Sequence, residues 1–209
     1  MHREKRDFDL AALTWDEKPR RIKLAKDIFA SLTGRVELTE GMEVLDFGCG
    51  TGLLSLQVLE RTGSVTCADS SSGMLEVLES KVNSARLSCV KTIHLKSDDG
   101  SGLTGSYDLI TMSMALHHVA DAASLVRRLA GLLKPGGSLC VADLYPDNGS
   151  FHSDNTGVYH FGFTRETMEN YYGMAGLHDF GFTTAAVVEH AGEKVEIASF
   201  KVFLATGRR

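Results

Sequence analysis

The stretch from Val44 to Gly52 constrains the fold of this chain more than any other part of its sequence. An apolar run there leads into three glycines that alternate with other residues, and a leucine-rich run follows. Glycine adopts backbone conformations that other residues avoid, and it lets a ligand approach the main chain closely. A strand, a tight turn and a helix in this order are typical of the edge at which open α/β sheets bind ligands. The stretch therefore predicts an α/β fold with a ligand at the end of its first strand.

The rest of the chain repeats this alternation of short apolar runs and helical runs. After the strand at 43–47, the apolar runs predict strands near 65–68, 91–95, 107–112, 138–142, 183–188 and 198–205. Helical patterns begin near Lys18, Thr51, Ser70–Ser72, Asp121 and Thr164. Alternation of this kind favours a mostly parallel sheet covered by helices. Only a turn at 191–193 separates the last two strands, so a hairpin would make one of them antiparallel to the rest.

Length and charge bound the class of protein. The chain has 209 residues, which suits a single domain. Its formal net charge is −5, and its Lys and Arg residues are scattered except at 18–26. We interpret that basic group as the solvated face of a helix, so a nucleic-acid partner is disfavoured. The charged start resembles no signal peptide, and no apolar run is long enough for a membrane span.

We therefore expect one domain over residues 1–209, with four parts. An N-terminal cap helix region would occupy 1–34, and a ligand-binding core 41–143. A looser, aromatic and glycine-rich segment begins near Asp143, and it predicts a substrate loop over 144–163. A C-terminal helix and strand pair would fill 164–209.

Cysteine usage indicates a reducing compartment. None of the four cysteines, Cys49, Cys67, Cys89 and Cys140, stands in CxxC spacing. Three lie in or beside apolar runs, which predicts buried free thiols. Free thiols are usual in the cytoplasm, where we expect this protein.

Carboxylates stand just past the second and third expected strands. Asp69 follows the strand at 65–68, and a carboxylate there can accept both hydroxyls of a ribose. Asp98 and Asp99 follow the strand at 91–95, where a carboxylate could accept a hydrogen bond from an adenine amino group. The sequence leaves both residues open for this second position.

Together these pieces resemble the class I S-adenosylmethionine-dependent methyltransferases. The matching pieces are Val44–Gly52, Asp69, Asp98, Tyr107–Ile110, Leu116–Val119 and Leu132–Gly137, in the family's order and spacing. The resemblance implies a Rossmann-like three-layer sandwich whose seven-stranded, mostly parallel sheet ends in an antiparallel strand pair. It also implies S-adenosyl-L-methionine as cofactor and S-adenosyl-L-homocysteine as product.

The resemblance implies roles around the first strand. Gly48, Gly50 and Gly52 would face the methionine part of the cofactor, and Asp46 would help hold its amino group. The start of the following helix offers N–H groups that favour a carboxylate.

Further along the chain, the resemblance assigns the rest of the cofactor. Asp69, with Ser70 beside it, would bind the ribose, and Asp98 or Asp99 the adenine. Ser113 and the region up to His117 would border the site of methyl transfer.

Histidines supply the candidate catalytic groups. His117 would stand near the methyl group, and we expect His118 to serve packing. Adjacent residues on a helix or strand point apart, so we predict no metal site at this pair. His160, in the aromatic segment Phe151–Phe163, is the candidate general base if the acceptor needs one. That segment could line the site or pack on the sheet as a hydrophobic flap.

Trp15, which precedes the first long helix, has two interpretations that the sequence leaves open. Its ring could lie over the positive sulfonium of the cofactor, because cations are attracted to aromatic faces. It could equally anchor the helix to the sheet.

The sequence thus predicts a methyltransferase of the EC 2.1.1 class that acts on a small molecule, with a protein substrate as second choice. One alternative is a non-catalytic S-adenosylmethionine-binding module that regulates a partner. Another is a nicotinamide-dependent oxidoreductase, because such enzymes share closely spaced glycines. The third glycine of their fingerprint would fall at Leu53, however, and no tyrosine has a lysine four positions after it.

Overall fold

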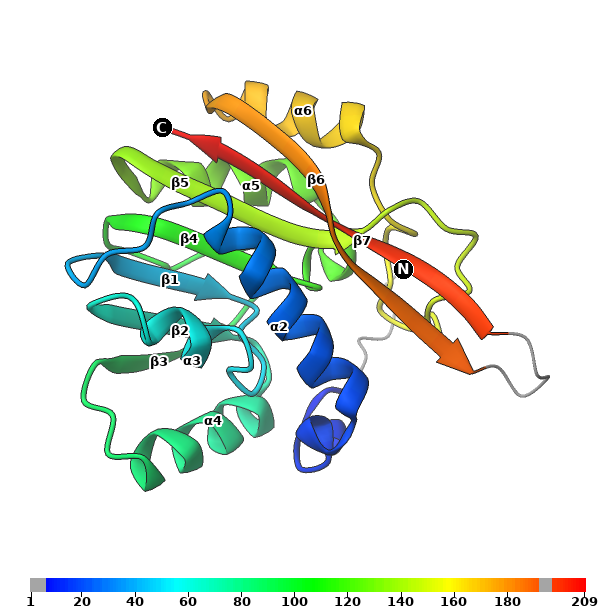
Figure 1. Cartoon of the computed structure of the whole chain (residues 1–209), viewed down its shortest axis with the longest axis horizontal. Helices are drawn as coiled ribbons and strands as arrows, with labels where there is room; N and C mark the ends of the chain where they lie inside the picture. Colours follow the sequence, from blue (N-terminus) through cyan, green and yellow to red (C-terminus); the bar gives the residue numbers. More distant parts are fainter. Residues whose placement is uncertain (1–6, 192–196) are drawn as a thin grey trace.

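The computed structural model describes residues 7–191 and 197–209, and within them the strands form one sheet (Figure 1). The order of its seven strands is β3-β2-β1-β4-β5-β7-β6. The strands are β1 Glu43–Phe47, β2 Ser64–Asp69, β3 Val90–His94, β4 Tyr107–Ser113, β5 Leu133–Leu144, β6 His178–Ala191 and β7 Ile197–Arg208. The expected α/β sheet is confirmed.

The direction of the strands also follows the expectation. Strands β1 to β5 pair in parallel. Strand β7 lies between β5 and β6 and is antiparallel to both, so it is the strand that runs against the rest. Residues 192–196, which include most of the expected turn, lie outside the described residues.

Helices cover both faces of the sheet, which makes the three layers. They are α1 Asp9–Ala12, η1 Trp15–Glu17, α2 Pro19–Thr33, α3 Ser55–Leu59, α4 Ser72–Ser84, η2 Leu116–His118, α5 Ala122–Gly131 and α6 Arg165–Met174. Side chains of α2, α3 and α4 share one buried apolar cluster, and those of α5 and α6 share the other. Figure 1 accordingly shows α2 in front of the sheet and α5 behind it.

Three helices begin at capping residues in the places where the sequence predicts a helix start, and of Ser70, Ser71 and Ser72 the cap is Ser71. The side chains of Ser71, Asp121 and Thr164 each accept a hydrogen bond from a backbone N–H in the first turn of α4, α5 and α6. Such a cap satisfies a donor that has no partner within the helix. These helices therefore begin where the local sequence says they should.

The central strand β1 connects the core to the site. Leu45 and Phe47 belong to the cluster on the side of α5, and Val44 to the cluster on the side of α2. This alternation follows from the two-residue period of a strand. It leaves Asp46, 2% exposed, as the polar residue in the buried part of the strand, since Glu43 at its start is exposed.

Several element boundaries differ from the prediction, and two of them lie next to the site. The helix expected from Thr51 begins only at Ser55, because Gly52 has φ +81°, a left-handed conformation that an α-helix cannot contain. The α3 helix has only five residues and starts after the glycine turn. It therefore does not supply the helix N-terminus that the sequence predicts at Thr51. Strand β5 continues through Asp143 and Leu144, which the sequence places in a loose segment. Pairing with β7 extends the strand that far.

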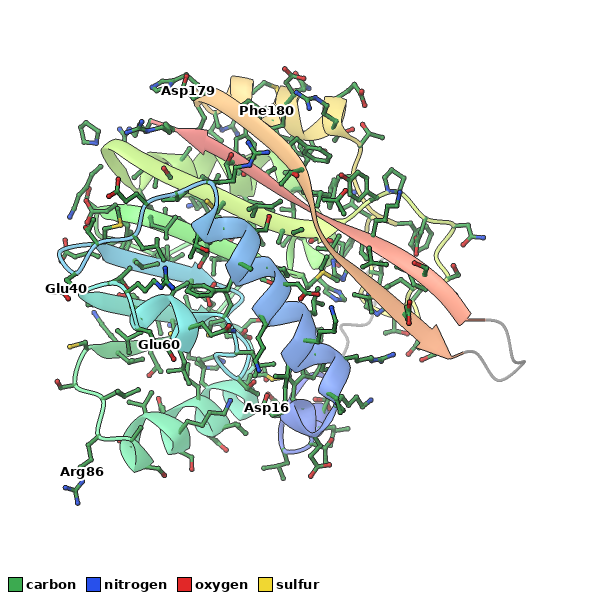
Figure 2. The ribbon with its side chains drawn as sticks, in the orientation of Figure 1. Asp16, Glu40, Glu60, Arg86, Asp179 and Phe180 are labelled. Atoms are coloured by element: carbon green, nitrogen blue, oxygen red, sulfur yellow. The ribbon has the colours of Figure 1, made fainter. Side chains whose placement is uncertain are left out.

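The N-terminal segment is joined to the sheet's binding edge by polar contacts. Asp9 accepts hydrogen bonds from Ser71 Oγ at 2.5 Å and Gly73 N at 2.9 Å, at the start of α4. Asp16, labelled in Figure 2, accepts a hydrogen bond from Thr51 Oγ1 at 2.6 Å. The segment before α2 is thereby placed over the glycine turn.

Two further predictions concern the burial of the cysteines and the lack of a membrane-spanning segment. Cys49, Cys67 and Cys140 are buried and free, as expected, while Cys89 is free and exposed. Among the helices of residues 7–191 and 197–209, none combines the length and apolar character needed to cross a membrane.

Candidate active site

A cavity of about 500 Å³ lies at the carboxyl ends of β1, β2 and β4. Its wall includes nine residues that the sequence singles out: Trp15, Asp46, Gly48, Gly50, Asp69, Ser70, Asp98, Ser113 and His117. Three others, Gly52, Asp99 and His160, are not part of that wall. The cavity therefore gathers most of the predicted site from segments far apart in the chain.

The glycine turn forms one end of the cavity. Gly48 and Gly50 have φ of +70° and +55°, which side-chain-bearing residues rarely adopt. A Cβ on Gly48 would come within 2.6 Å of the Ala115 Cβ, whereas a Cβ on Gly50 would have only Met74 Sδ within 4.0 Å. Gly50 thus leaves room on the cavity side that a side chain would fill. Gly52 instead packs against Leu78, so its absence of a side chain serves the fold.

Asp46 places a buried carboxyl group at the same end. It accepts hydrogen bonds from Ser55 Oγ at 2.5 Å and from Thr111 Oγ1 at 2.8 Å. Burial raises the pKa of Asp46 to about 6, although these two hydrogen bonds oppose the rise. A neighbouring cation would favour the charged form of this group.

Asp69 stands at the end of β2 and reaches across to the glycine turn. Its two carboxyl oxygens accept hydrogen bonds from Gly50 N at 2.7 Å and Ser71 N at 2.9 Å. Burial raises the pKa of Asp69, and the backbone hydrogen bonds from Ser71 and Gly50 oppose that rise. Each carboxylate oxygen can accept more than one hydrogen bond, so the group retains capacity for a ligand hydroxyl.

The structure separates the two carboxylates that the sequence leaves open. Asp98 is partly buried and lines the cavity. Asp99 is exposed, and its side chain accepts a hydrogen bond from Ser101 N at 2.8 Å. Hydrogen bonds from Ser101 lower the pKa of Asp99 to about 2. Asp99 therefore closes a turn of its own, and of the two carboxylates Asp98 is the one that lines the cavity.

The basic residues at the start of α2 correct one interpretation of the sequence. Arg20 and Arg21 line the cavity instead of forming only a solvated helix face. The Arg21 guanidinium lies 3.4 Å from the centre of the Trp15 ring and donates a hydrogen bond to the Trp15 carbonyl at 3.0 Å. Trp15 thus lines the cavity while one face of its ring stacks on a cation of the protein itself.

A cluster of three histidines, His117, His118 and His152, forms another part of the wall. The Nε2 atoms of His117 and His152 are 3.0 Å apart. The rings of His117 and His118 lie side by side, with centroids 4.1 Å apart. The expectation that adjacent histidines point apart is therefore wrong here, because η2 is a single 3-10 turn between two loops and not a regular helix or strand.

Asp143 holds the first of these histidines. It is fully buried at the end of β5 and accepts a hydrogen bond from His117 Nδ1 at 2.7 Å. Burial raises the pKa of Asp143, but the charge of His117 and hydrogen bonds from His117 and Leu144 outweigh it, so the pKa is lowered overall. Asp143 accepts from Nδ1 whether the His117 ring is charged or neutral, and in the neutral ring this contact leaves the lone pair on Nε2, toward His152.

The aromatic segment after β5 partly lines the cavity and partly packs in the core, so each of the two interpretations holds for some of its residues. Phe151, His152 and Tyr159 line the cavity, whereas Phe163 is buried in the core. His160 does not reach the cavity, because its Nε2 lies 3.0 Å from the Val119 carbonyl oxygen. We therefore do not retain it as a candidate base.

Three residues at the site were not singled out by the sequence: the wall residues His152 and Met114, and the fully buried Asp143, which contacts His117. Asp143 has a signal that could have found it, because it follows an apolar strand in the same way as Asp69. His152 belongs to the aromatic segment, but no residue next to it in the sequence marks it as part of a site. Met114, at the end of β4, has φ +55°, a strained conformation that concentrates at functional sites and has no sequence signal.

Comparison with known proteins agrees with this geometry. The family model described as a methyltransferase domain matches residues 45–139. An uncharacterized methyltransferase of Schizosaccharomyces pombe is 33% identical over 152 residues, 66% of this chain and 54% of that protein. Residues 45–139 thus form part of a methyltransferase domain of the class I S-adenosylmethionine-dependent type.

Two further methyltransferases extend the comparison. A demethylmenaquinone methyltransferase of Listeria welshimeri is 28% identical over 183 residues, covering 75% of this chain and 77% of that protein. Phosphoethanolamine N-methyltransferase 2 of Haemonchus contortus, solved with S-adenosyl-L-methionine, has the same fold at a TM-score of 0.71. It is 15% identical, and the match covers 88% of this chain and 52% of that one. The chain spans about half the length of the first curated relatives it matches.

The cavity of this methyltransferase fits the cofactor of its family. Room beside Gly50, the buried carboxyl group of Asp46 and the carboxylates of Asp69 and Asp98 match the groups of S-adenosyl-L-methionine, which has an ammonium, a ribose and an adenine. The comparisons confirm the predicted Rossmann-like methyltransferase domain, while the role of each residue stays a prediction.

Proposed function

We propose that this methyltransferase binds S-adenosyl-L-methionine in the cavity and transfers the methyl group to a small molecule. One observation carries the proposal. A single cavity joins the glycine turn and its carboxylates to a wall of histidines and aromatic rings. The first part suits the cofactor, and the second offers space and polar groups for an acceptor.

A small acceptor is supported by the size and charge of the site. Pockets of about 300–1,000 Å³ are typical of small-molecule sites, and this one measures about 500 Å³. The net charge of −5 gives a polyanion no general attraction. The names of two relatives, a demethylmenaquinone and a phosphoethanolamine methyltransferase, also indicate small acceptors. A protein side chain is the second choice. The buried thiols support a reducing compartment such as the cytoplasm.

The residues of the chain would act mainly by orienting the cofactor and the acceptor toward each other. The cofactor supplies an electrophilic methyl group on its sulfonium. Asp46, Asp69 and Asp98 would hold the two ends of the cofactor, and Phe151 and Tyr159 would cover the acceptor and exclude water. Alignment of two bound reactants can contribute about 7–11 kcal/mol to lowering a barrier. His117, oriented by Asp143, is the candidate to accept a proton from the acceptor or to hold it.

Calorimetric titration of the purified chain with S-adenosyl-L-methionine, S-adenosyl-L-homocysteine and NADH tests the cofactor. We expect micromolar binding of both sulfur compounds and none of NADH. Binding of NADH in their place would revive the oxidoreductase alternative and overturn our proposal. A radiolabelled methyl group and a panel of small acceptors then test transfer. Tight cofactor binding with no transfer to any acceptor class would favour the non-catalytic regulatory module.

Asp98→Ala and Asp99→Ala form a matched pair for the adenine position. We expect Asp98→Ala to weaken the binding of S-adenosyl-L-homocysteine by roughly tenfold, the value of one hydrogen bond to a charged group. Asp99→Ala should bind it as the native chain does, because the Asp99 side chain is exposed and turned toward Ser101. Calorimetric titration measures both. A larger loss in Asp99→Ala than in Asp98→Ala would reverse the assignment.

The pKa of Asp46 predicts how cofactor affinity depends on pH. Because that pKa is about 6, Asp46 is ionised above it and neutral below it. Only the ionised form attracts an ammonium group, so affinity should fall by about tenfold for each pH unit below about 6. Titration of the native chain between about pH 5 and pH 8 measures this slope. Asp46→Asn should bind more weakly and without the slope, and a native affinity that is flat over the range would contradict the role.

A further inference from the structure

We propose that His117, His118 and His152 form a binding site for a divalent transition-metal ion in the wall of the cavity. One ring nitrogen of each histidine lies within 4.8 Å of those of the other two. Neutral imidazole is a preferred ligand of zinc and of related first-row metals. Three histidines with a further position left for water or substrate are a usual arrangement in catalytic zinc sites.

The distances between the rings suit a shared ion. The Nε2 atoms of His117 and His152 are 3.0 Å apart. Two nitrogens bound to one tetrahedral zinc, each at about 2.0–2.1 Å, stand about 3.4 Å from each other. The ring centroid of His152 lies 5.1 Å from that of His117 and 5.5 Å from that of His118, and the three ligand atoms lie within 4.8 Å of one another, so small side-chain adjustments would bring all three to ligand distance.

The second nitrogens of two rings are held in the way that metal-binding histidines require. His117 Nδ1 is 2.7 Å from the buried Asp143 carboxylate, and His118 Nδ1 is 2.8 Å from the Gly157 carbonyl oxygen. A carbonyl oxygen only accepts, so His118 donates from Nδ1, and its neutral ring carries the lone pair on Nε2. Histidines that bind metals regularly donate their other N–H to a carboxylate or carbonyl. The outer contacts therefore prepare both rings as ligands.

The three ligands come from two segments that the fold brings together. His117 and His118 lie in η2, directly after β4, and His152 lies in the segment between β5 and α6. Backbone hydrogen bonds join these segments, since Tyr159 N and His160 N both donate to the His117 carbonyl, at 2.9 and 3.2 Å. The cluster is thus braced by main-chain contacts and not only by the rings themselves.

A metal at this place would deepen the proposed function, on which this step rests. The ion would take an oxygen or sulfur atom of the acceptor as a further ligand, because the cluster lines the same cavity as the cofactor residues. Metal binding lowers the pKa of a coordinated hydroxyl or thiol. His117 would then be a ligand and not a proton acceptor.

Metal binding by the full chain can be measured without the cofactor. We would strip the purified protein with a chelator and titrate it with Zn²⁺ against a coloured competing chelator. Co²⁺ uptake, followed by its visible absorption, reports on the coordination geometry. We expect one ion per chain.

The variants His152→Ala and His160→Ala make the matched comparison. Both remove an imidazole from the same segment, but the His160 ring contacts the Val119 carbonyl outside the cluster. We expect His152→Ala to weaken Zn²⁺ binding by at least about tenfold and to change the Co²⁺ absorption, with His160→Ala close to native. His152→Ala should still bind S-adenosyl-L-homocysteine, which shows that it is folded.

Two results would overturn the proposal. One is a native chain that takes up no metal, which would make the cluster a hydrogen-bonded histidine pair. The other is equal Zn²⁺ binding by His152→Ala and His160→Ala, which would place the ion elsewhere, for example at cysteine thiols. Neither result bears on the proposed function, because cofactor binding and methyl transfer are measured separately.

Discussion

The Asp69→Asn variant is expected to bind S-adenosyl-L-homocysteine about a hundredfold more weakly than the native chain. Asp69 lines the cavity at the end of β2, and the substitution removes its charge with little change in shape. A hydrogen bond to a charged group contributes roughly 1.5–3 kcal/mol, and a ribose offers two hydroxyls. Asparagine would also present an N–H group to Gly50 N or Ser71 N, both of which donate to Asp69 in the native structure. Calorimetric titration measures the loss.

Asp108→Asn is the control for this experiment. Asp108 is also a partly buried aspartate of the sheet, but it lies at the opposite end of β4, where it pairs with Lys134 at 2.8 Å and accepts a hydrogen bond from Glu43 N. It should lose some stability and no cofactor affinity. If Asp69→Asn melts like the native chain and binds with native affinity, the ribose assignment is wrong.

The Tyr172→Ala variant is expected to lose about 3–5 kcal/mol of the free energy of unfolding. The Tyr172 side chain is fully buried under the outer strands, and its hydroxyl donates to the Ala205 carbonyl at 3.1 Å. Its ring fills the space at Gly207, where a Cβ would come within 2.6 Å of Cδ1. Alanine would leave a cavity there. Thermal melting should show a fall of roughly 10 °C for a chain of this length.

Two substitutions separate the parts of this effect. Tyr172→Phe removes only the hydroxyl and should cost about 1 kcal/mol. Tyr171→Ala truncates the neighbouring residue, which is only partly buried, and should cost less than Tyr172→Ala. Equal losses in Tyr171→Ala and Tyr172→Ala would show that α6 does not pack on β7 in the way described.

The sequence alone was sufficient for the elements whose signals are local. The strand at 43–47 and the helix starts at Ser70–Ser72, Asp121 and Thr164 depend on neighbours within a few residues. The short separation of the last two expected strands was likewise enough to predict their antiparallel pairing. The carboxyl ends of parallel strands lie along one edge of a sheet, so the sequence could predict that Asp69 shares one site with Asp98 or Asp99. Only the structure separates the last two, because Asp98 alone lines the cavity.

The start of α3 depends on both local sequence and tertiary packing. The spacing of leucines after Thr51 is helical, but Gly52 is left-handed and leaves no room for a Cβ beside Leu78 of α4. The contact that decides this lies in a different element, so the local pattern predicted a helix that starts too early.

The wall opposite the glycine turn was decided by tertiary structure. His152 lies 35 residues after His117, and Asp143 lies 26 residues after it, yet both contact its ring. No local period relates such residues, and the loop before α6 could have packed on the sheet in many ways. Sequence therefore determined the fold class, the family and the cofactor end of the cavity, because repeated local patterns and strand ends specify them. Only the packing of η2 against the segment after β5 decided which histidines meet, because their contact depends on the path of an irregular chain.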